Sequence, residues 1–450
     1  MLYHRLRDLE ARGDTIQVGL IAAGTFGTQI VSQMSHAAGM RIAAIAELDP
    51  QKALRAYGHG GISSAQVTTA ETPEDIDAAI ASGRPAVVTS ARALMESEVD
   101  IIIEATGNVE AGAAHARYAI AQGKHVVMVT VEADVVVGYQ LGKLADAAGV
   151  LYSAAYGDEP ALALELWDWA CALGFRVIAA GKGTRFKTAF RKATPDDVPK
   201  MYGFTGEDYN AQMFGSFLDG TKHAIEMAAL ANMSGLVPDV RGMHFPSVDL
   251  REIPDKLCHR DKGGMLGQEG IVEAISSIDS NDVAVERNIR GGLYCVVDGQ
   301  TPFIIESLGS YGEIIGQIIG QRSGYSMIYR PQHWCGHEMP ITIGRMLLNN
   351  ETCGRPIGQF AEVVAAAKKP LPAGTVLDGE GGYCTYGLIE KAAVAREENL
   401  LPLGLSQGAV LSRDIPEDGM VTYDDVEVPD SELLELRKLQ DAGSVHNETA

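Results

Sequence analysis

The stretch Thr15-Ile-Gln-Val-Gly-Leu-Ile-Ala22, followed by Gly24-Thr25-Phe26-Gly27, decides the fold. Its first part is an apolar run typical of a buried strand, and it ends in small residues at a turn. The glycines open a helix that we expect to continue to about Ala38. A second apolar run, Arg41 to Glu47, ends on an acid. Together these segments predict a βαβ unit of the kind that binds dinucleotides.

The phosphate-binding part of this unit is the pattern Ala22-x-Gly24-x-x-Gly27, with alanine in place of the usual first glycine. Gly24 lets the backbone approach a pyrophosphate, and Gly27 lets the helix pack on the strand. Glu47 can accept hydrogen bonds from a ribose diol, which by itself favours NAD, although Lys52 and Arg55 follow closely. The alternative is a glycine-rich turn that binds no ligand. The predicted cofactor contacts are Ala22, Gly24, Thr25, Phe26, Gly27, Glu47, Thr106, Gly107 and Asn108.

The rest of the first region continues the alternation of strands and helices. A strand at 99–105 ends in Thr106-Gly107-Asn108, which we expect beside the nicotinamide ribose unless it is only a strand-to-helix turn. A helix near 113–122 and a strand at 125–130 complete a doubly wound parallel sheet, and a short helix at 1–14 precedes it. We therefore predict a Rossmann domain over 1–155. The Gly-, Ser- and Thr-rich segment 58–90 predicts a long loop over the cofactor site, with a short helix near 73–82.

Two further domains follow in this prediction, so the fold class is α/β with a central α+β catalytic domain and a small C-terminal β-rich domain. Residues 156–360 include a helix at 160–173, a strand at 175–181 and a long helix at 219–234. Residues 361–450 begin with a strand and continue with short β-type runs between prolines and glycines. We expect the last twenty residues, which are acidic and polar, to fray.

Composition excludes several classes of protein. The chain has 450 residues, of which 46% are hydrophobic and 21% charged, as in globular proteins of about three domains. A net charge of −22 disfavours nucleic acid and anionic membranes as partners. The six cysteines include no C-x-x-C pair, and the N-terminus has no signal-peptide pattern. We therefore expect a cytoplasmic protein with reduced thiols.

A basic segment in this acidic chain is the predicted substrate site. The run from Lys182 to Lys192 contains five basic residues in eleven positions and follows an apolar strand. Backbone N–H groups and an ammonium can converge there on a phosphate or carboxylate. The alternative is a solvated basic face that balances nearby acids. The predicted substrate contacts are Thr184, Arg185, Lys187, Arg330 and His333.

Three residues are the predicted catalytic groups: Lys182, Lys222 and Asp219. Lys222 and His223 begin a helix, where the helix dipole disfavours cations, so we expect a compensating anion nearby. Asp219 as an ordinary N-cap is the alternative for that residue. The adjacent acids Asp158 and Glu159 are candidate functional residues, for which helix capping is again the alternative. The H-x-C-x-H spacing from His333 is not interpreted as a zinc site, because alternate residues of one stretch rarely enclose the ion.

Several motifs together resemble a known family. They are Val18 to Gly27, Val131-Glu-Ala-Asp134, Ala155-Tyr-Gly-Asp-Glu-Pro160, Ala180-Gly-Lys-Gly-Thr184, Met213 to Lys222 and Tyr329-Arg-Pro-Gln-His333. Over nearly its whole length the chain resembles homoserine-dehydrogenase-like oxidoreductases with a C-terminal SAF domain. Within that group it is most similar to the deoxyxylulose phosphate reductoisomerase-like enzymes, the second type of that activity. Residues 361–430 resemble the SAF module.

The resemblance implies NADPH-dependent conversion of 1-deoxy-D-xylulose 5-phosphate to 2-C-methyl-D-erythritol 4-phosphate, a step in isoprenoid precursor synthesis. It also implies a divalent cation, Mg²⁺ or Mn²⁺, with Asp158, Glu159 and Asp219 as candidate ligands, and a small phosphorylated substrate. A homo-oligomer is the default expectation for such dehydrogenases.

Two departures keep alternatives open. Homoserine dehydrogenases place an Asn-Lys pair where this chain has Val129-Thr-Val-Glu132-Ala-Asp134, and the lysine is absent. The Ala22 and Glu47 pattern fits NADPH less well than an arginine after the strand would, so NADH stays an alternative. The competing functions are an NAD(P)-dependent dehydrogenase of another small hydroxy or amino acid, including homoserine, and a nucleotide-sensing regulator.

Overall fold

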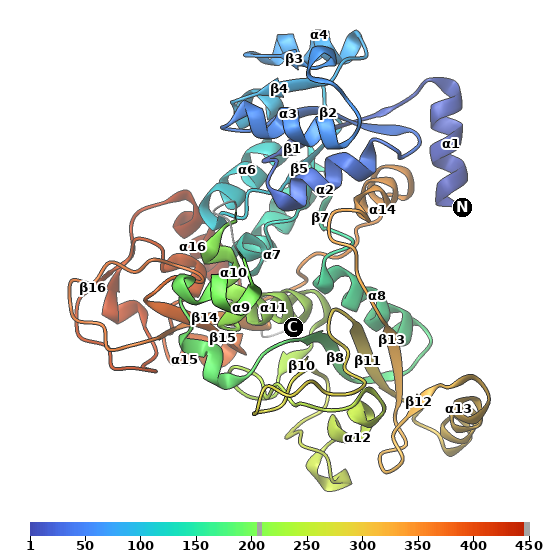
Figure 1. The fold of residues 1–450 in the computed structure, drawn as a ribbon, viewed down its shortest axis with the longest axis vertical. Coiled ribbons are helices and arrows are strands. Elements are labelled where there is room, and N and C mark those ends of the chain that lie inside the picture. Colours follow the sequence, from blue (N-terminus) through green and yellow to red (C-terminus); the bar gives the residue numbers. More distant parts are fainter. Residues whose placement is uncertain (205–208, 445–450) are drawn as a thin grey trace. The chain divides into compact units, whose positions relative to one another are not determined.

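The computed structural model describes residues 1–204 and 209–444, and the chain divides into two compact units (Figure 1). Unit 1 contains Met1–Ala161, Trp334–Pro356 and the described residues from Ser431. Unit 2 contains Leu162–His333 and Ile357–Asp430. Among the described residues, no helix combines the length and apolar character that a membrane span needs.

Unit 1 is built on a parallel sheet whose strand order is β3-β4-β2-β1-β5-β6-β7. Every neighbouring pair in it runs parallel, because each strand is followed by a helical crossover. The strands are β1 (Ile16–Ile21), β2 (Met40–Ala46), β3 (Thr68–Thr69), β4 (Ala86–Val88), β5 (Ile101–Glu104), β6 (His125–Met128) and β7 (Tyr152–Ala154). The helices are α1 (Leu2–Arg12), α2 (Thr25–Met34), α3 (Pro50–His59), α4 (Pro73–Ala81), α5 (Ala91–Glu96), α6 (Val109–Ala121), α7 (Val131–Ala148), α14 (Met339–Gly344) and α16 (Glu432–Ser444).

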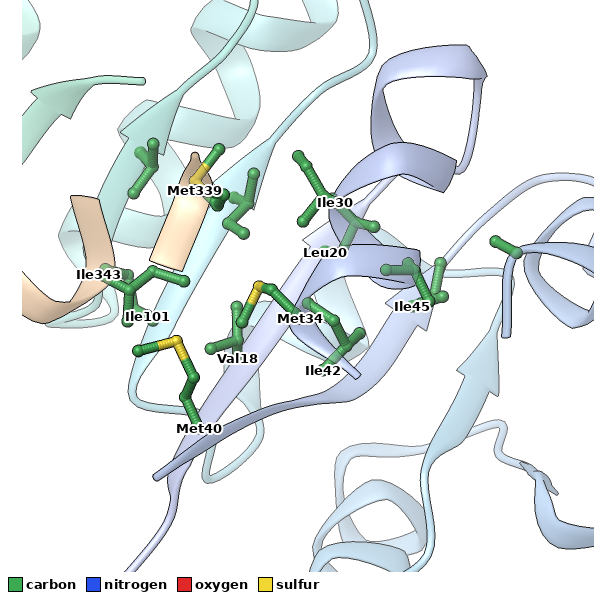
Figure 2. Close-up of a cluster of buried hydrophobic side chains, with 14 of the residues drawn as sticks. Val18, Leu20, Ile30, Met34, Met40, Ile42, Ile45, Ile101, Met339 and Ile343 are labelled. Carbon is green, nitrogen blue, oxygen red and sulfur yellow. The ribbon is translucent and has the colours of Figure 1, made fainter. Parts of the chain in front are cut away.

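The core of unit 1 lies between β1, β2 and the helices that follow them, as Figure 2 shows. Val18 and Leu20 of β1 are fully buried and face Ile30 and Met34 of α2. β1 is an almost continuous apolar run, as is typical of a parallel strand that is covered on both faces. The segment Trp334–Pro356 also contributes, because Met339 and Ile343 of α14 enter the same cluster. A short π-helical turn, Arg345–Asn349, follows α14.

Two expectations about unit 1 were wrong. Residues 58–90 are not a long loop: they include β3, β4 and α4, and α4 confirms the helix predicted near 73–82. β3 is the edge strand of the sheet, and β4 pairs with both β3 and β2. The last twenty residues do not simply fray, since α16 packs against α6 and α7 with Leu433 and Leu436 buried. Gln440, also buried on α16, donates to the backbone oxygen of Val136 at 2.9 Å. Residues 445–450 lie outside the described part of the chain.

Unit 2 contains a mixed sheet with the strand order β12-β13-β11-β8-β10-β9. β8 is central; it runs parallel to β10 and antiparallel to β11. The strands are β8 (Arg176–Thr184), β9 (Val237–Pro238), β10 (Ile271–Ser276), β11 (Leu293–Asp298), β12 (Ile318–Ile319) and β13 (Ser326–Arg330). The helices are α8 (Glu159–Ala172), which begins in unit 1, α9 (Val198–Tyr202), α10 (Ala211–Leu218), α11 (Thr221–Ser234), α12 (Ile253–Lys256) and α13 (Pro302–Ile315).

The C-terminal β elements belong to unit 2. They are the antiparallel pairs β14 (Ala361–Ala367) with β15 (Thr385–Lys391) and β16 (Val410–Leu411) with β17 (Val426–Glu427), and the helix α15 (Ala392–Glu397). Helix α11 contacts β8 and β10 on one side and β14 and β15 on the other. This explains why its sequence is small and apolar all round, with every residue except Lys222 buried. The predicted fold class is confirmed, while the boundaries at 155 and 360 stay predictions.

Candidate functional site

The phosphate turn of unit 1 has the geometry that the sequence predicts. Ala22 adopts φ 71°, a left-handed conformation that glycine takes without strain. Gly24 is the N-cap of α2, and Thr25 and Phe26 form its first turn. A Cβ on Gly27 would lie 2.4 Å from the backbone oxygen of Ala22, so glycine is required there, whereas a Cβ on Gly24 would meet no atom within 4 Å. The open side at Gly24 is where a pyrophosphate can approach the helix N-terminus.

Glu47, predicted to contact a ribose, supports the turn itself. Its Oε2 accepts a hydrogen bond from the backbone N–H of Ala23 at 2.8 Å, and Oε1 accepts from the N–H of Asp49 at 3.3 Å. A carboxylate at this place also repels a 2′-phosphate. The ribose contact stays a prediction.

The segment Thr106-Gly107-Asn108 follows β5, as expected. The Thr106 hydroxyl donates to Glu104 Oε1 at 2.6 Å, and Asn108 caps α6 by accepting from the N–H of Ala111. Glu104 was not predicted: it is fully buried, and its Oε2 has no hydrogen-bond partner among the described atoms. His115 Nδ1 lies 3.3 Å from Glu104 Oε1. The strand-to-helix turn therefore explains Asn108 without a ligand, and the nicotinamide contact stays a prediction.

Two acids at the end of unit 1 are the metal-ligand candidates. Asp158 is half-buried and Glu159, the first residue of α8, is buried. The preceding Gly157 packs against the backbone of Trp334 and the side chain of Glu338. Two carboxylates supply the hard oxygen donors that Mg²⁺ and Mn²⁺ prefer, so their chemistry fits a divalent cation.

Lys182 and Glu226 form a deeply buried ion pair at the predicted substrate site of unit 2. Lys182 Nζ, near the end of β8, contacts Glu226 Oε2 on α11, and the side chains are 3% and 1% exposed. The other carboxylate oxygen of Glu226, Oε1, has no hydrogen-bond partner among the described atoms. Two opposite charges removed from water in this way carry a large desolvation cost, which is typical of functional sites.

A hydroxyl and an imidazole lie beside this pair. Thr184 Oγ1 is 2.8 Å from His223 Nε2, and His223 Nδ1 is 3.9 Å from Glu226 Oε2. The rings of Phe186 and Phe245 lie edge-on to His223, at centroid distances of 6.1 and 6.2 Å. Four groups that can donate or accept protons are thus enclosed at the carboxyl end of β8: an ammonium, an imidazole, a carboxylate and a hydroxyl. Glu226 is the anion expected near the first turn of α11.

The capping alternative for Asp219 was wrong, and its catalytic role stays a prediction. Gly220, and not Asp219, is the N-cap of α11; Asp219 ends α10. It is fully buried, its Oδ1 accepts from the N–H of Thr221 at 2.9 Å, and its Oδ2 lies 2.8 Å from Lys368 Nζ. Burial raises the pKa of Asp219, and the lysine opposes that rise. Because Lys368 occupies Oδ2, Asp219 does not fit a metal ligand.

The basic run separates into different environments. Lys187 pairs with Asp282 at 2.5 Å, and Lys192 pairs with Glu417 and Asp418. Arg185 instead lies over the ring of Phe190, with Cζ 5.6 Å from the centroid. Of the more distant candidates, Arg330 Nη1 is 3.7 Å from Glu165, His333 Nδ1 is 2.9 Å from the backbone oxygen of Gly291, and Lys222 is half-buried at the start of α11.

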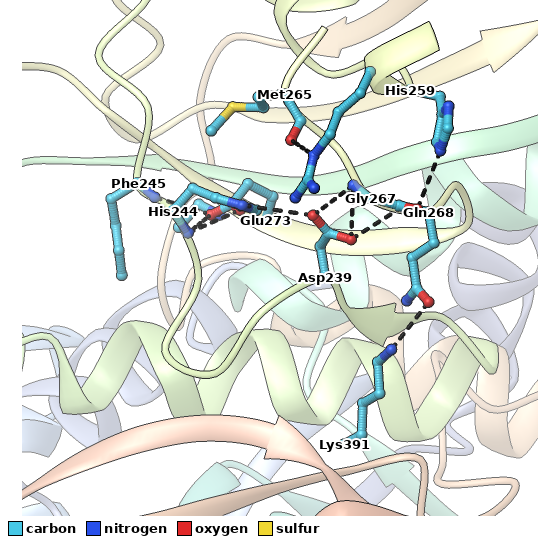
Figure 3. Close-up of polar contacts among 11 residues, drawn as sticks. Asp239, His244, Phe245, His259, Met265, Gly267, Gln268, Glu273 and Lys391 are labelled. Atoms are coloured by element: carbon cyan, nitrogen blue, oxygen red, sulfur yellow. Dashed lines mark hydrogen bonds and ion pairs between the residues drawn. The ribbon is translucent and has the colours of Figure 1, made fainter.

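A second polar network is centred on Glu273 of β10, as Figure 3 shows. The fully buried Glu273 accepts from the backbone N–H groups of His244 and Phe245 and from His244 Nδ1 at 2.8 Å. His244 Nε2 lies 3.5 Å from Asp239. The hydrogen bond to Glu273 raises the pKa of His244. This network holds the left-handed Phe245, φ 48°, against Phe186 and His223.

Sequence reasoning missed three of these groups: Glu226, Lys368 and Glu104. A signal for Glu226 exists, because it follows Lys222 and His223 by four and three residues on one helix. Glu104 is visible as an acid that ends an apolar strand. Nothing near Lys368 indicates Asp219 as its partner, since the two are joined only by the tertiary fold.

Two family models match consecutive segments of the chain. Residues 157–339 match the model "Oxidoreductase DRL, catalytic domain", and residues 22–153 match "Homoserine dehydrogenase, NAD binding domain". The first match includes Lys182, Thr184, His223 and Glu226. The second begins at Ala22 of the phosphate turn. No curated protein matches the sequence.

Solved structures give weaker similarities. A scyllo-inositol dehydrogenase from Lactobacillus casei with bound NAD(H) and scyllo-inositol is 12% identical over 75% of this chain and 90% of its own, with a TM-score of 0.38. An oxidoreductase from Agrobacterium radiobacter in complex with NAD⁺, L-tartaric acid and magnesium is 14% identical over 45% of this chain and 54% of its own, with a TM-score of 0.29. Similarities of this size carry no information on activity.

Proposed function

Because this chain is an NAD(P)-binding oxidoreductase with a DRL-type catalytic domain, we propose that it is an NADPH-dependent reductoisomerase. Its reaction is the conversion of 1-deoxy-D-xylulose 5-phosphate to 2-C-methyl-D-erythritol 4-phosphate. The observation that carries the proposal is the enclosed group Lys182, Glu226, Thr184 and His223, which lies inside the segment 157–339 that matches the DRL catalytic domain.

The proposed reaction first rearranges the carbon chain of the keto sugar and then reduces the new aldehyde. The rearrangement needs a donor to the carbonyl oxygen and an acceptor for a hydroxyl proton. Lys182 Nζ is the donor, oriented by its ion pair with Glu226. His223, linked to Thr184 Oγ1 at 2.8 Å, is the group that accepts and returns the hydroxyl proton. Lys222, at the start of the same helix, is the second candidate donor.

The nicotinamide cofactor supplies the hydride for the reduction, and a divalent cation, where bound, would polarise adjacent substrate oxygens. Gly24 and Gly27 are the residues that would hold the pyrophosphate, and Asp158 and Glu159 those that would hold the cation. NADPH is the proposed reductant. The Glu47 carboxylate favours NADH instead, so both cofactors belong in the test.

A second candidate is a dehydrogenase of another small hydroxy or amino acid. The observation that favours it is the match of residues 22–153 to the homoserine dehydrogenase NAD-binding domain. In that case no carbon–carbon bond is rearranged, and the basic site holds a carboxylate.

The deciding experiment follows oxidation of NADPH and NADH with 1-deoxy-D-xylulose 5-phosphate and Mg²⁺ or Mn²⁺, with identification of the product, in parallel with the homoserine reaction. Formation of 2-C-methyl-D-erythritol 4-phosphate is the expected result, and Lys182→Ala should abolish it. Lys192→Ala is the matched control from the same basic run, because that lysine is exposed and paired with Glu417. Turnover of homoserine alone, or of neither compound by protein that binds NADPH, would overturn the proposal.

A further inference from the structure

Most charges around the end of β8 are neutralised by partners. Lys182 is paired with Glu226 and Lys187 with Asp282. The acid nearest the start of α11, Asp219, is paired with Lys368. An anionic substrate at this site therefore needs positive groups other than these lysines.

Arg185 is one such group. It follows Thr184 directly after β8, is half-buried, and makes a cation–π contact with Phe190. Within the described chain its guanidinium is paired with no carboxylate.

Arg290 is the other, and no sequence signal selects it. The turn from Ile289 to Gly292 is fixed against β8: the N–H of Gly291 donates to Gly183 at 3.1 Å, and the N–H of Gly183 donates to Gly292 at 2.9 Å. A Cβ on Gly183 would lie 2.0 Å from the Ile289 oxygen, so the two backbones approach as closely as glycine allows. Arg290 forms a β-bridge with Gly183, and its side chain is exposed and, among the described residues, without a carboxylate partner.

Both guanidinium groups act on one phenol. Tyr202, at the end of α9, is 38% exposed, and its ring lies 5.4 Å from the ring of Phe214 on α10. Desolvation raises the pKa of Tyr202, while the charges of Arg290 and Arg185 lower it. The β-bridge between Gly183 and Arg290 brings Arg290 close to the backbone two residues before Arg185, and the ring contact places Tyr202 against α10.

We propose that Arg185 and Arg290 form a two-arginine site for a dianionic phosphoryl group, with the Tyr202 hydroxyl as an additional donor. Guanidinium groups bind phosphate oxygens through paired N–H donors, and two of them balance two negative charges. The substrate that this site selects is a phosphate monoester, whose reacting carbons extend from the arginines towards Lys182. The inference rests on the proposed function only for the identity of that substrate.

The test uses inorganic phosphate as the probe and the full chain saturated with NADPH, so that the phosphate turn at Gly24 is occupied. Phosphate affinity is measured by isothermal titration at constant ionic strength, with chloride as the reference anion. Arg185→Gln and Arg290→Gln should each weaken phosphate binding at least tenfold. Arg287→Gln is the matched control: it removes an arginine three residues from Arg290 that is paired with Asp249, and phosphate affinity should stay within about twofold.

Unchanged phosphate affinity in both variants, or an equal loss in Arg287→Gln, would overturn the site. Circular dichroism and NADPH affinity show whether each variant is folded. The outcomes separate this inference from the proposed function. Arginine-dependent phosphate binding without turnover of 1-deoxy-D-xylulose 5-phosphate supports the site and refutes that substrate. Turnover with an unchanged KM in both variants refutes the site alone.

Discussion

Replacing Lys182 and Glu226 with methionine, singly and together, tests whether their buried ion pair serves activity more than stability. The side chains are 3% and 1% exposed, so each single change leaves the other group without its partner in a site shielded from solvent. Breaking a buried pair in this way costs about 3–5 kcal/mol of unfolding free energy, whereas replacing both partners with apolar groups of similar size is close to neutral. Methionine approximates the volume of both side chains.

The expected loss of unfolding free energy can be expressed as a decrease in melting temperature. In a unit of this size, 1 kcal/mol corresponds to about 2–4 °C, so each single variant should melt about 6–20 °C below the wild type. The double variant should recover most of that loss. Its activity should stay absent, because the ammonium that orients the substrate is gone.

Thermal unfolding followed by circular dichroism, with NADPH oxidation as the activity assay, measures both quantities. Lys192→Met is the control, since Lys192 and Glu417 are exposed and their pair contributes about 0–1 kcal/mol. If the single variants melt with the wild type, the pair is not buried as described. If the double variant remains active, Lys182 is not a catalytic residue.

Three other predictions concern pH and the phosphate turn. Burial raises the pKa of Asp134 from 3.8 to about 6, so this group lowers the free energy of unfolding by about 3 kcal/mol in all as pH rises through that range. Asp134→Asn should remove this loss, which is measured by comparing urea unfolding at about pH 4 and about pH 8. Glu273 raises the pKa of His244, so the contribution of His244 to the free energy of unfolding is present at low pH and is lost as pH rises through the raised pKa. His244→Gln should flatten that part of the dependence of unfolding free energy on pH. Gly27→Ala, whose Cβ meets the Ala22 oxygen, should lower both the melting temperature and NADPH affinity, whereas Gly24→Ala should lower only the affinity.

The sequence predicted the elements whose signals are local. The run before Ala22 is apolar throughout, and the glycines after it are needed by the turn itself, so strand, turn and helix follow from adjacent residues. The prediction of a loop over 58–90 was wrong because β3 and β4 are only two and three residues long, too short to show a hydrophobic period. Both strands are stabilised by pairing in the sheet. The prediction of a frayed C-terminus was wrong because Leu433 and Leu436 of α16 are buried where α16 packs against α6 and α7, which precede it by hundreds of residues.

The residues of the candidate site likewise fall into those that local sequence signals placed and those that only the tertiary fold brings together. Lys182 and Thr184 could be placed at a strand end from the apolar run before them, and the structure puts them there. Their partners Glu226 and His223 are on α11, and periodicity shows that these share a helix but not that the helix covers β8. Arg290 has no local signal, because the close approach of two glycine-bearing segments places it beside Gly183.

The C-terminal β region has a part in this site that its sequence does not reveal. Gly387 of β15 donates its N–H to Thr221 Oγ1 at 2.7 Å, and the N–H of Ala361 in β14 donates to Asn232 Oδ1 at 2.9 Å, so both ends of α11 are fixed by this region. Lys368, just after β14, supplies the charge that neutralises Asp219, and its ammonium also donates to the backbone oxygens of Ala193 and Gly382. Without that lysine the buried carboxylate of Asp219 would lack an opposite charge. The region that resembles an appended module therefore holds both ends of α11 in place and neutralises a buried acid beside the start of that helix.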